Sequence, residues 1–172
     1  TTGSLNTFVG ASAGSTTDDG ASNTAVGAYA LDAGNCGDNN VAIGAGSLGD
    51  SSYTASNNVA VGKDAGGALT SGTDNVAVGS FALASNTTGG TNTAIGNDCM
   101  DSNTEGSNNT AIGVDALQAD TKGSHSTAIG RQALQAQNFT SATDTHNTAV
   151  GNNAGLAVTT GTYNTLMGSN VA

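Results

Sequence analysis

The stretch Asn23-Thr24-Ala25-Val26-Gly27 decides the fold, because the chain writes ten close variants of it. The closing glycine returns after 17 residues in seven of the nine intervals, after 18 in one and after 21 in another. A fixed period of this length is typical of a solenoid, in which each repeat forms one turn. Since no linker interrupts the repeats, we expect residues 1–172 to form a single all-β domain, a parallel β-solenoid of ten coils. The closing glycines are Gly10, Gly27, Gly44, Gly62, Gly79, Gly96, Gly113, Gly130, Gly151 and Gly168.

The three residues before each glycine have the pattern of a strand. Val or Ile comes immediately before the glycine in nine copies, and Thr or Val lies three before it in all ten. Alanine stands between them in eight copies, with Phe8 and Leu166 in the first and last. Alternation that includes β-branched residues predicts a β-strand. We expect the Val/Ile column to face the inside of the coil and alanine to face outward, against a close neighbour. A second short strand and a polar loop are expected after the glycine.

Asparagine and a second glycine mark the approach to each strand. Asparagine opens every copy except one, where Ser126 replaces it, and stacked asparagines can form a side-chain ladder along a solenoid. A glycine lies three residues before this position in eight copies. The other two have Ala55 and Asp144, and they are the copies with the longer loops. We expect these eight glycines to supply turns with positive φ.

Composition narrows the possible partners. The net charge is −10, with 13 acidic residues against Lys63, Lys122 and Arg131. A protein that binds nucleic acid carries a basic stripe, and this chain has none. No segment approaches the ~20 apolar residues of a membrane helix, so we expect no membrane insertion. The chain has neither an initiator Met nor a signal segment at its start, which favours a processed product or an excerpt of a longer protein.

The two cysteines, Cys36 and Cys99, lie in coils four apart. Four strand spacings amount to roughly 19 Å. A disulfide needs Cα atoms within ~7 Å, so we expect no bridge within the chain. Cys99 stands where most other repeats have alanine and is expected to fill that space. Cys36 lies in a loop, from which pairing between chains remains open.

The repeat Asn-Thr-Ala-Val-Gly-x-x-Ala-Leu, with Gly-x-x-Asn ahead of the next copy, resembles two related repeat types. One is the head repeat of YadA-like trimeric autotransporter adhesins, and the other is a similar repeat of bacteriophage tail fibres. The resemblance covers all ten repeats, although the period here is longer than in the adhesin heads. It implies a left-handed parallel β-roll with three chains side by side, and a structural or adhesive role without enzyme chemistry or cofactor.

Two functions follow from this resemblance and from the ends of the chain. The first is a segment of a phage tail fibre or bacterial surface adhesin, extracellular on a cell surface or virion. It would supply length and rigidity and present loops to a cell-surface glycan or receptor. The alternative is an extracellular filament subunit, with or without glycosylation, that stacks end to end. The near identity of residues 1–7 and 159–165 favours this alternative, because it brings the two ends almost into phase.

The loops that break the period are the expected recognition or decoration sites. The longest loop, 135–146, carries Asn138 and Phe139, and the second longest carries Tyr53. The acceptor pattern for N-glycosylation occurs at Asn86, Asn108 and Asn138.

A metal site is conceivable at the only two histidines. His125 and His146 occupy equivalent positions in successive repeats, so their rings should lie ~4.8 Å apart. With Asp144 close by, they form a candidate set of metal ligands. The competing interpretation is a pair of exposed histidines in a polar column.

Other functions fit the sequence less well. The segment 26–31 resembles a hexapeptide of β-helix acyltransferases, but those enzymes need three hexapeptides per coil and a general base. A threonine rank for ice binding is interrupted by Val41, Val59 and Val76, and we expect it to face inward. The aspartates at 64, 98 and 115 share one column and fit a solvated outer face better than a calcium site. With no nucleophile–base pair, we expect the chain not to be an enzyme.

Overall fold

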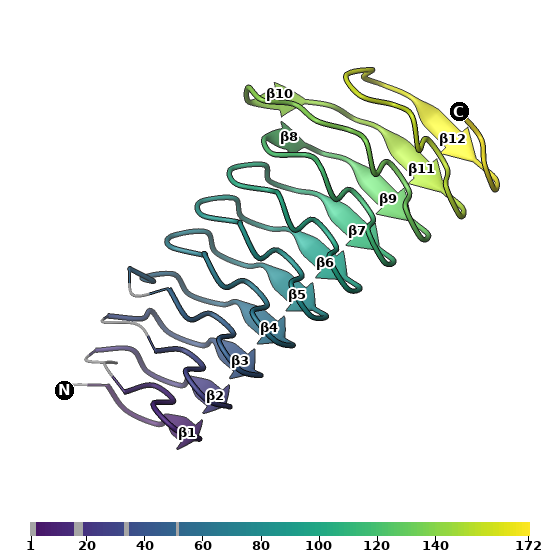
Figure 1. Cartoon of the computed structure of the whole chain (residues 1–172). Coiled ribbons are helices and arrows are strands. Elements are labelled where there is room, and N and C mark those ends of the chain that lie inside the picture. The colour runs from purple at the N-terminus through teal and green to yellow at the C-terminus, as the bar shows by residue number, and fades with distance from the viewer. Residues whose placement is uncertain (1–2, 16–18, 33–34, 51) are drawn as a thin grey trace.

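The computed structural model describes residues 3–15, 19–32, 35–50 and 52–172. Within these ranges the chain contains strands and turns but no helix. Ten strands form one parallel sheet in chain order, and a second sheet has two short strands (Figure 1). The predicted parallel β-solenoid is therefore confirmed. The ten strands are β1 (Thr7–Val9), β2 (Thr24–Val26), β3 (Val41–Ile43), β4 (Val59–Val61), β5 (Val76–Val78), β6 (Thr93–Ile95), β7 (Thr110–Ile112), β9 (Thr127–Ile129), β11 (Thr148–Val150) and β12 (Thr165–Met167), and the other two are β8 (Gly123–Ser124) and β10 (Thr143–Asp144).

Every strand of the large sheet pairs in register with the next, so equivalent residues of the repeat lie directly above one another. Ala94 of β6, for example, is opposite Ala77 of β5 and Ala111 of β7. The coils advance along one axis from the N-terminus to the C-terminus (Figure 1). Ten coils at ~4.8 Å each give a length of roughly 48 Å.

The strands present the opposite face to the one expected. Ala94 and Ala111 are fully buried, whereas Ile95 and Ile112 are 38% and 37% exposed. The prediction of an inward Val/Ile column was wrong. The interior also receives a leucine from the turn after the glycine, such as Leu117, which is 0% exposed. A narrow coil has room for this leucine only if the strand contributes alanine, because protein interiors are close-packed.

Changes of size in the core compensate one another between the strand and this turn. In the first coil the strand contributes Phe8 instead of alanine, and the turn has Gly14 instead of leucine. A Cβ at Gly14 would collide with the Phe8 ring. Gly66 likewise replaces leucine in the fourth coil, where the loop supplies the buried Leu69. The core therefore keeps nearly constant volume from coil to coil.

The segment after each glycine is a turn, not the second strand that we expected. Its residues at two and four positions after the glycine have positive φ, as in Phe81 (59°) and Leu83 (53°). The residue before the asparagine has positive φ as well, for example 58° at Thr91. Left-handed backbone is rare outside glycine and asparagine, and here it recurs in every coil. These residues with positive φ turn the backbone and so close each coil.

The glycines that lie three residues before the asparagines have a different role from the expected one. Gly89 and Gly106 do not have positive φ. A Cβ at Gly89 would instead collide with the carbonyl oxygen of Gly106 in the next coil. Glycine is needed here because the backbones of neighbouring coils approach closely.

The predicted asparagine ladder is present and buried. The side-chain oxygen of Asn92 accepts a hydrogen bond from the backbone N–H of Asn109, 3.0 Å away in the next coil. The amide nitrogen of Asn109 donates to the carbonyl oxygen of Gly123 at 2.8 Å. Each asparagine thus joins its coil to the next through both ends of its amide, and satisfies backbone groups that no strand pairs.

Candidate functional site

The aromatic side chains of the two longer loops, Tyr53 and Phe139, are buried in the interior. The Tyr53 hydroxyl donates to the side-chain oxygen of Asn40 (2.6 Å) and accepts from the amide of Asn58 (3.0 Å). Tyr53 is 0% exposed, and burial raises its pKa well above the usual range. Its expected role as a surface recognition residue is therefore wrong. It strengthens the asparagine ladder in the coil whose loop has Ala55 instead of glycine.

The asparagine ladder lacks one side-chain amide, at Ser126, and the longest loop supplies a replacement from Gln137. The Gln137 amide nitrogen donates to the Ser126 hydroxyl at 2.9 Å, and its oxygen accepts from Asn147 at 2.8 Å. Phe139 follows it inward and is 8% exposed, so its predicted recognition role is also wrong, whereas Asn138 is exposed.

Gln137 ends a buried polar column on the loop side of the interior. The members are Asn86, Asn103, Asp120 and Gln137, all at most 1% exposed. The amide of Asn86 donates to the carbonyl oxygen of Gly89 at 2.8 Å, so this predicted glycosylation site faces the interior. Asn108 and Asn138 are exposed, and glycosylation there stays a prediction.

Both cysteines are buried. Cys99 is 0% exposed and its thiol contacts the carbonyl oxygen of Ala111 at 3.3 Å, which confirms that it fills an alanine position. Burial raises the pKa of the Cys99 thiol to about 12. Cys36 is 2% exposed, so the disulfide between chains that its loop position left open would need this loop to rearrange.

The predicted acidic column lies at the turn after the glycine. Asp98 and Asp115 are partly exposed, as expected of a solvated face. Nearby, partial burial raises the pKa of Asp101, and the negative charges of Asp98 and Asp115 contribute in the same direction.

The structure brings the predicted histidine cluster together. The rings of His125 and His146 stack with centroids 5.1 Å apart and planes 19° apart. The Asp144 carboxylate lies 3.2 Å from Nδ1 of His125. Tyr163 of the following coil stacks on His146 at 5.0 Å. All three candidate ligands are exposed, so an ion could reach them from solvent.

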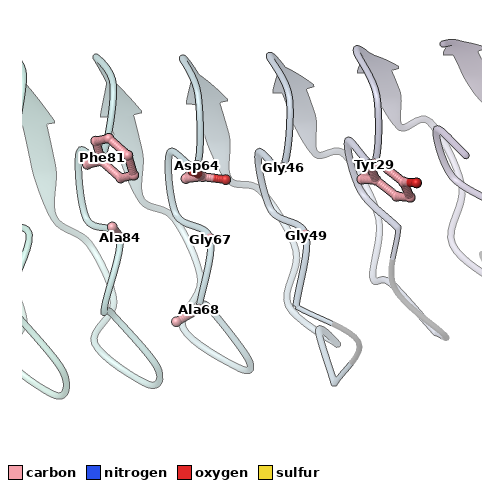
Figure 2. Close-up of a pocket in the computed structure, with 8 residues that line it drawn as sticks. All are labelled: Tyr29, Gly46, Gly49, Asp64, Gly67, Ala68, Phe81 and Ala84. Carbon is pink, nitrogen blue, oxygen red and sulfur yellow. The ribbon is translucent and has the colours of Figure 1, made fainter. Parts of the chain in front are cut away.

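A hollow of about 390 Å³ lies on the edge of the solenoid where the chain turns after the glycine. Tyr29 and Phe81 stand at its two ends, three coils apart, with Asp64 between them (Figure 2). Its floor is made of glycine and alanine because coils three and four lack side chains that other coils carry there. The floor residues are Gly46, Gly49, Gly67, Ala68 and Ala84.

Charged groups sit beside the Phe81 end of this hollow. The Lys63 ammonium bonds the Asp64 carboxylate at 2.7 Å and lies 4.5 Å from the centroid of the Phe81 ring. Tyr29 is 59% exposed at the other end. The hollow therefore combines an exposed aromatic ring with a donor and an acceptor of hydrogen bonds. Sequence reasoning missed it, although the glycines at 46, 49 and 67 were a signal of missing side chains.

The outer face of the large sheet carries a long stripe of apolar side chains. Its ten strands contain no charged residue, and the Val/Ile column runs along nine of them, with Met167 in β12. The Thr/Val column beside it, which we expected to point inward, is also partly exposed, as at Thr24 and Val41. Uncharged apolar surface of this extent is typical of an interaction face.

Two further findings concern the whole chain. Among the residues described, no helix has the length and apolarity to cross a membrane. Searches of protein-family models, curated proteins and solved structures give no match to this chain.

Proposed function

We propose that the chain is a structural segment of an extracellular fibre or adhesin, a left-handed β-roll that associates as a homotrimer through the outer face of its large sheet. One observation carries this proposal: the stripe of exposed and partly exposed β-branched side chains on ten strands without a charge. Extended apolar surface exposed on a folded protein marks a site of association. Burial of the stripe would contribute about 25 cal/mol for each Å² of apolar surface removed from water.

The distribution of charge supports association through this face. The 12 acidic residues in the described part of the chain lie outside the strands of the large sheet, in turns, loops and the short strand β10. Copies that meet through the strand face therefore keep their carboxylates apart. A net charge of −10 would oppose contact through most other surfaces.

Analytical ultracentrifugation of the purified chain tests the trimer. We expect a mass near three chains, and a monomer for the double variant Ile95→Lys, Ile112→Lys, because two lysines per chain would bring like charges together at the centre of the face. The matched control is Val114→Lys, an exposed position outside the strands. A monomeric wild-type chain at high protein concentration would contradict the proposal.

For the adhesive role, we propose that the hollow between Tyr29 and Phe81 binds a glycan. Sugar rings pack their apolar faces on aromatic rings, and the Lys63–Asp64 pair offers a donor and an acceptor to hydroxyl groups. Tyr29→Ala should weaken glycan binding by about tenfold, the value of one aromatic contact. Glycan-array binding measures this, with Tyr163→Ala, an exposed tyrosine away from the hollow, as control. If Tyr29→Ala bound glycans as well as the wild type does, the hollow would be excluded as the glycan-binding site.

The alternative function, a filament that grows end to end, has its own supporting observation. Each asparagine oxygen from Asn6 to Asn109 accepts from the next coil, and Asn164 would continue this pattern into the Asn6 of a following copy. Electron microscopy separates the two functions: stacking predicts long filaments with an axial repeat of roughly 48 Å. Particles of one fixed length would contradict stacking.

A further inference from the structure

The second sheet joins the longest loop to the loop of the preceding coil and places a carboxylate beside a histidine. Strands β8 and β10 pair in parallel with Asp144 opposite Ser124, the residue before His125. The backbone N–H of Thr145 donates to the carbonyl oxygen of Ser124 at 2.9 Å and continues this pairing. In eight other repeats the position of Asp144 holds glycine, so this arrangement depends on the exceptional loop.

The second histidine, His146, has the same position in the repeat as His125 and lies one coil further along the solenoid. Both residues have left-handed backbone, with φ of 64° at His125 and 50° at His146. The backbone N–H of His125 donates to the carbonyl oxygen of Ser107 at 3.1 Å. Tyr163 covers the other face of the His146 ring. The backbone and the stacked rings thus hold both imidazoles on one exposed side of the solenoid.

We propose that His125, Asp144 and His146 form a binding site for a divalent transition-metal ion, with Zn²⁺ as the ion that fits best. Two imidazoles and one carboxylate are ligands that Zn²⁺ accepts, and solvent would complete its tetrahedral coordination. Ca²⁺ and Mg²⁺ prefer sets of oxygen ligands and fit less well. The net charge of −10 further favours a cation.

Binding requires only small movements of the three side chains. The ligand atoms lie within 4.8 Å of one another, whereas an ion would hold each at ~2.0–2.2 Å. The side chains of His125 and Asp144 are 40% and 68% exposed, so they can adjust without disturbing the buried core. The ion would replace the direct contact between His125 and Asp144 and bridge two coils. This site is independent of the proposed fibre role.

Isothermal titration of the whole chain, freed of metal with a chelator, with zinc chloride at pH 7.5 tests the site. We expect one Zn²⁺ per chain, and at least a tenfold loss of affinity in each of His125→Asn, His146→Asn and Asp144→Asn. Asparagine already occupies this column with left-handed backbone at positions 39, 57 and 108, so the histidine variants should fold. Circular dichroism of each variant checks this, and Tyr29→Phe, at an exposed position in the second coil, should bind like the wild type.

A further measurement separates this site from binding elsewhere. Zinc should raise the melting temperature of the wild type but not that of the double variant His125→Asn, His146→Asn, because an ion that binds only the folded chain stabilises it. No binding by the wild type, or unchanged binding by the double variant, would overturn the proposal.

Discussion

Thr91 is a β-branched residue in left-handed backbone, with φ of 58°. This conformation costs a non-glycine residue of order 1–3 kcal/mol, and asparagine tolerates it best. Equivalent positions in other coils hold Asn39, Asn57 and Asn108. The repeat therefore imposes one backbone conformation on side chains that differ in how well they accept it.

We predict that Thr91→Asn raises the free energy of unfolding by about 1 kcal/mol, because asparagine is less strained in left-handed backbone. Thr91 is exposed, so the change removes little packing. Chemical denaturation of both proteins measures the difference. Thr88→Asn is the control, since Thr88 is exposed but does not have positive φ. An equal gain in the control would show that backbone strain is not the cause.

Tyr53 is a second position where one side chain decides the stability of a coil. Tyr53→Phe removes the hydroxyl that donates to the side-chain oxygen of Asn40 and accepts from Asn58. The Asn40 oxygen keeps the backbone N–H of Asn58 as a donor, and the Asn58 amide keeps the carbonyl oxygen of Gly72 as an acceptor. We predict a loss of about 1–3 kcal/mol in the free energy of unfolding, because two buried hydrogen bonds are lost. Denaturant titration measures it, and Tyr163→Phe, 73% exposed in the wild type, should change little. A loss below 0.5 kcal/mol, by the same measure, would contradict the buried bridge.

At the scale of the strand, the inward alanine column limits the width of every coil. We predict that Ala94→Val costs about 1–3 kcal/mol of stability, because two methyl groups would be forced into a packed interior. Ile95→Val, one position along on the outer face, should cost much less in the monomer. Thermal unfolding of the two variants compares the faces directly. If Ile95→Val cost more stability than Ala94→Val, the result would instead support the expectation that Val and Ile point inward.

At the turn after the strand, Asp101 makes stability depend on pH. Its pKa is raised in the folded chain, first by partial burial and then by Asp98 and Asp115. The folded state therefore holds the Asp101 proton more tightly than the unfolded state. The resulting stabilisation is fully present below the unfolded pKa of about 3.9 and is lost as pH rises through the folded value.

We predict that Asp101→Asn is more stable than the wild type at pH 7 by a few tenths of a kcal/mol, a small gain because the carboxyl is partly exposed. The gain should vanish below about pH 4, where the wild-type carboxyl is protonated as well. Urea titrations at pH 7 and pH 3.5 measure it. Asp101→Glu keeps the charge and should show no such gain. A benefit that is independent of pH would exclude charge as its cause.

At the scale of the whole molecule, nearly all contacts join neighbouring coils, and the surface divides into faces of different chemistry. The sheet presents uncharged Val, Ile and Thr, while the turns and loops carry the carboxylates, the hollow at Tyr29 and the histidine cluster. Stability in such an array is the sum of each coil and its contact with the next. The molecule can therefore lengthen without altering its cross-section, as the proposed fibre role requires.

The sequence by itself determined the period, the parallel stacking and the asparagine ladder, because equivalent residues of a regular repeat must lie above one another. The same rule placed His125 and His146 side by side. It also marked the two longer loops as special, although not the direction in which Tyr53 and Phe139 point. Register along the axis is a property of spacing, and spacing is visible in the sequence.

Only the tertiary structure decided which side of each strand faces the core. Alternation shows that Ala94 and Ile95 point in opposite directions, but it does not show which one shares the interior with Leu83 and Leu117. That choice depends on volume: the turn already sends a leucine inward through left-handed backbone, so the strand can add only alanine. The β-branched residues are left on the surface, where a second chain can cover them.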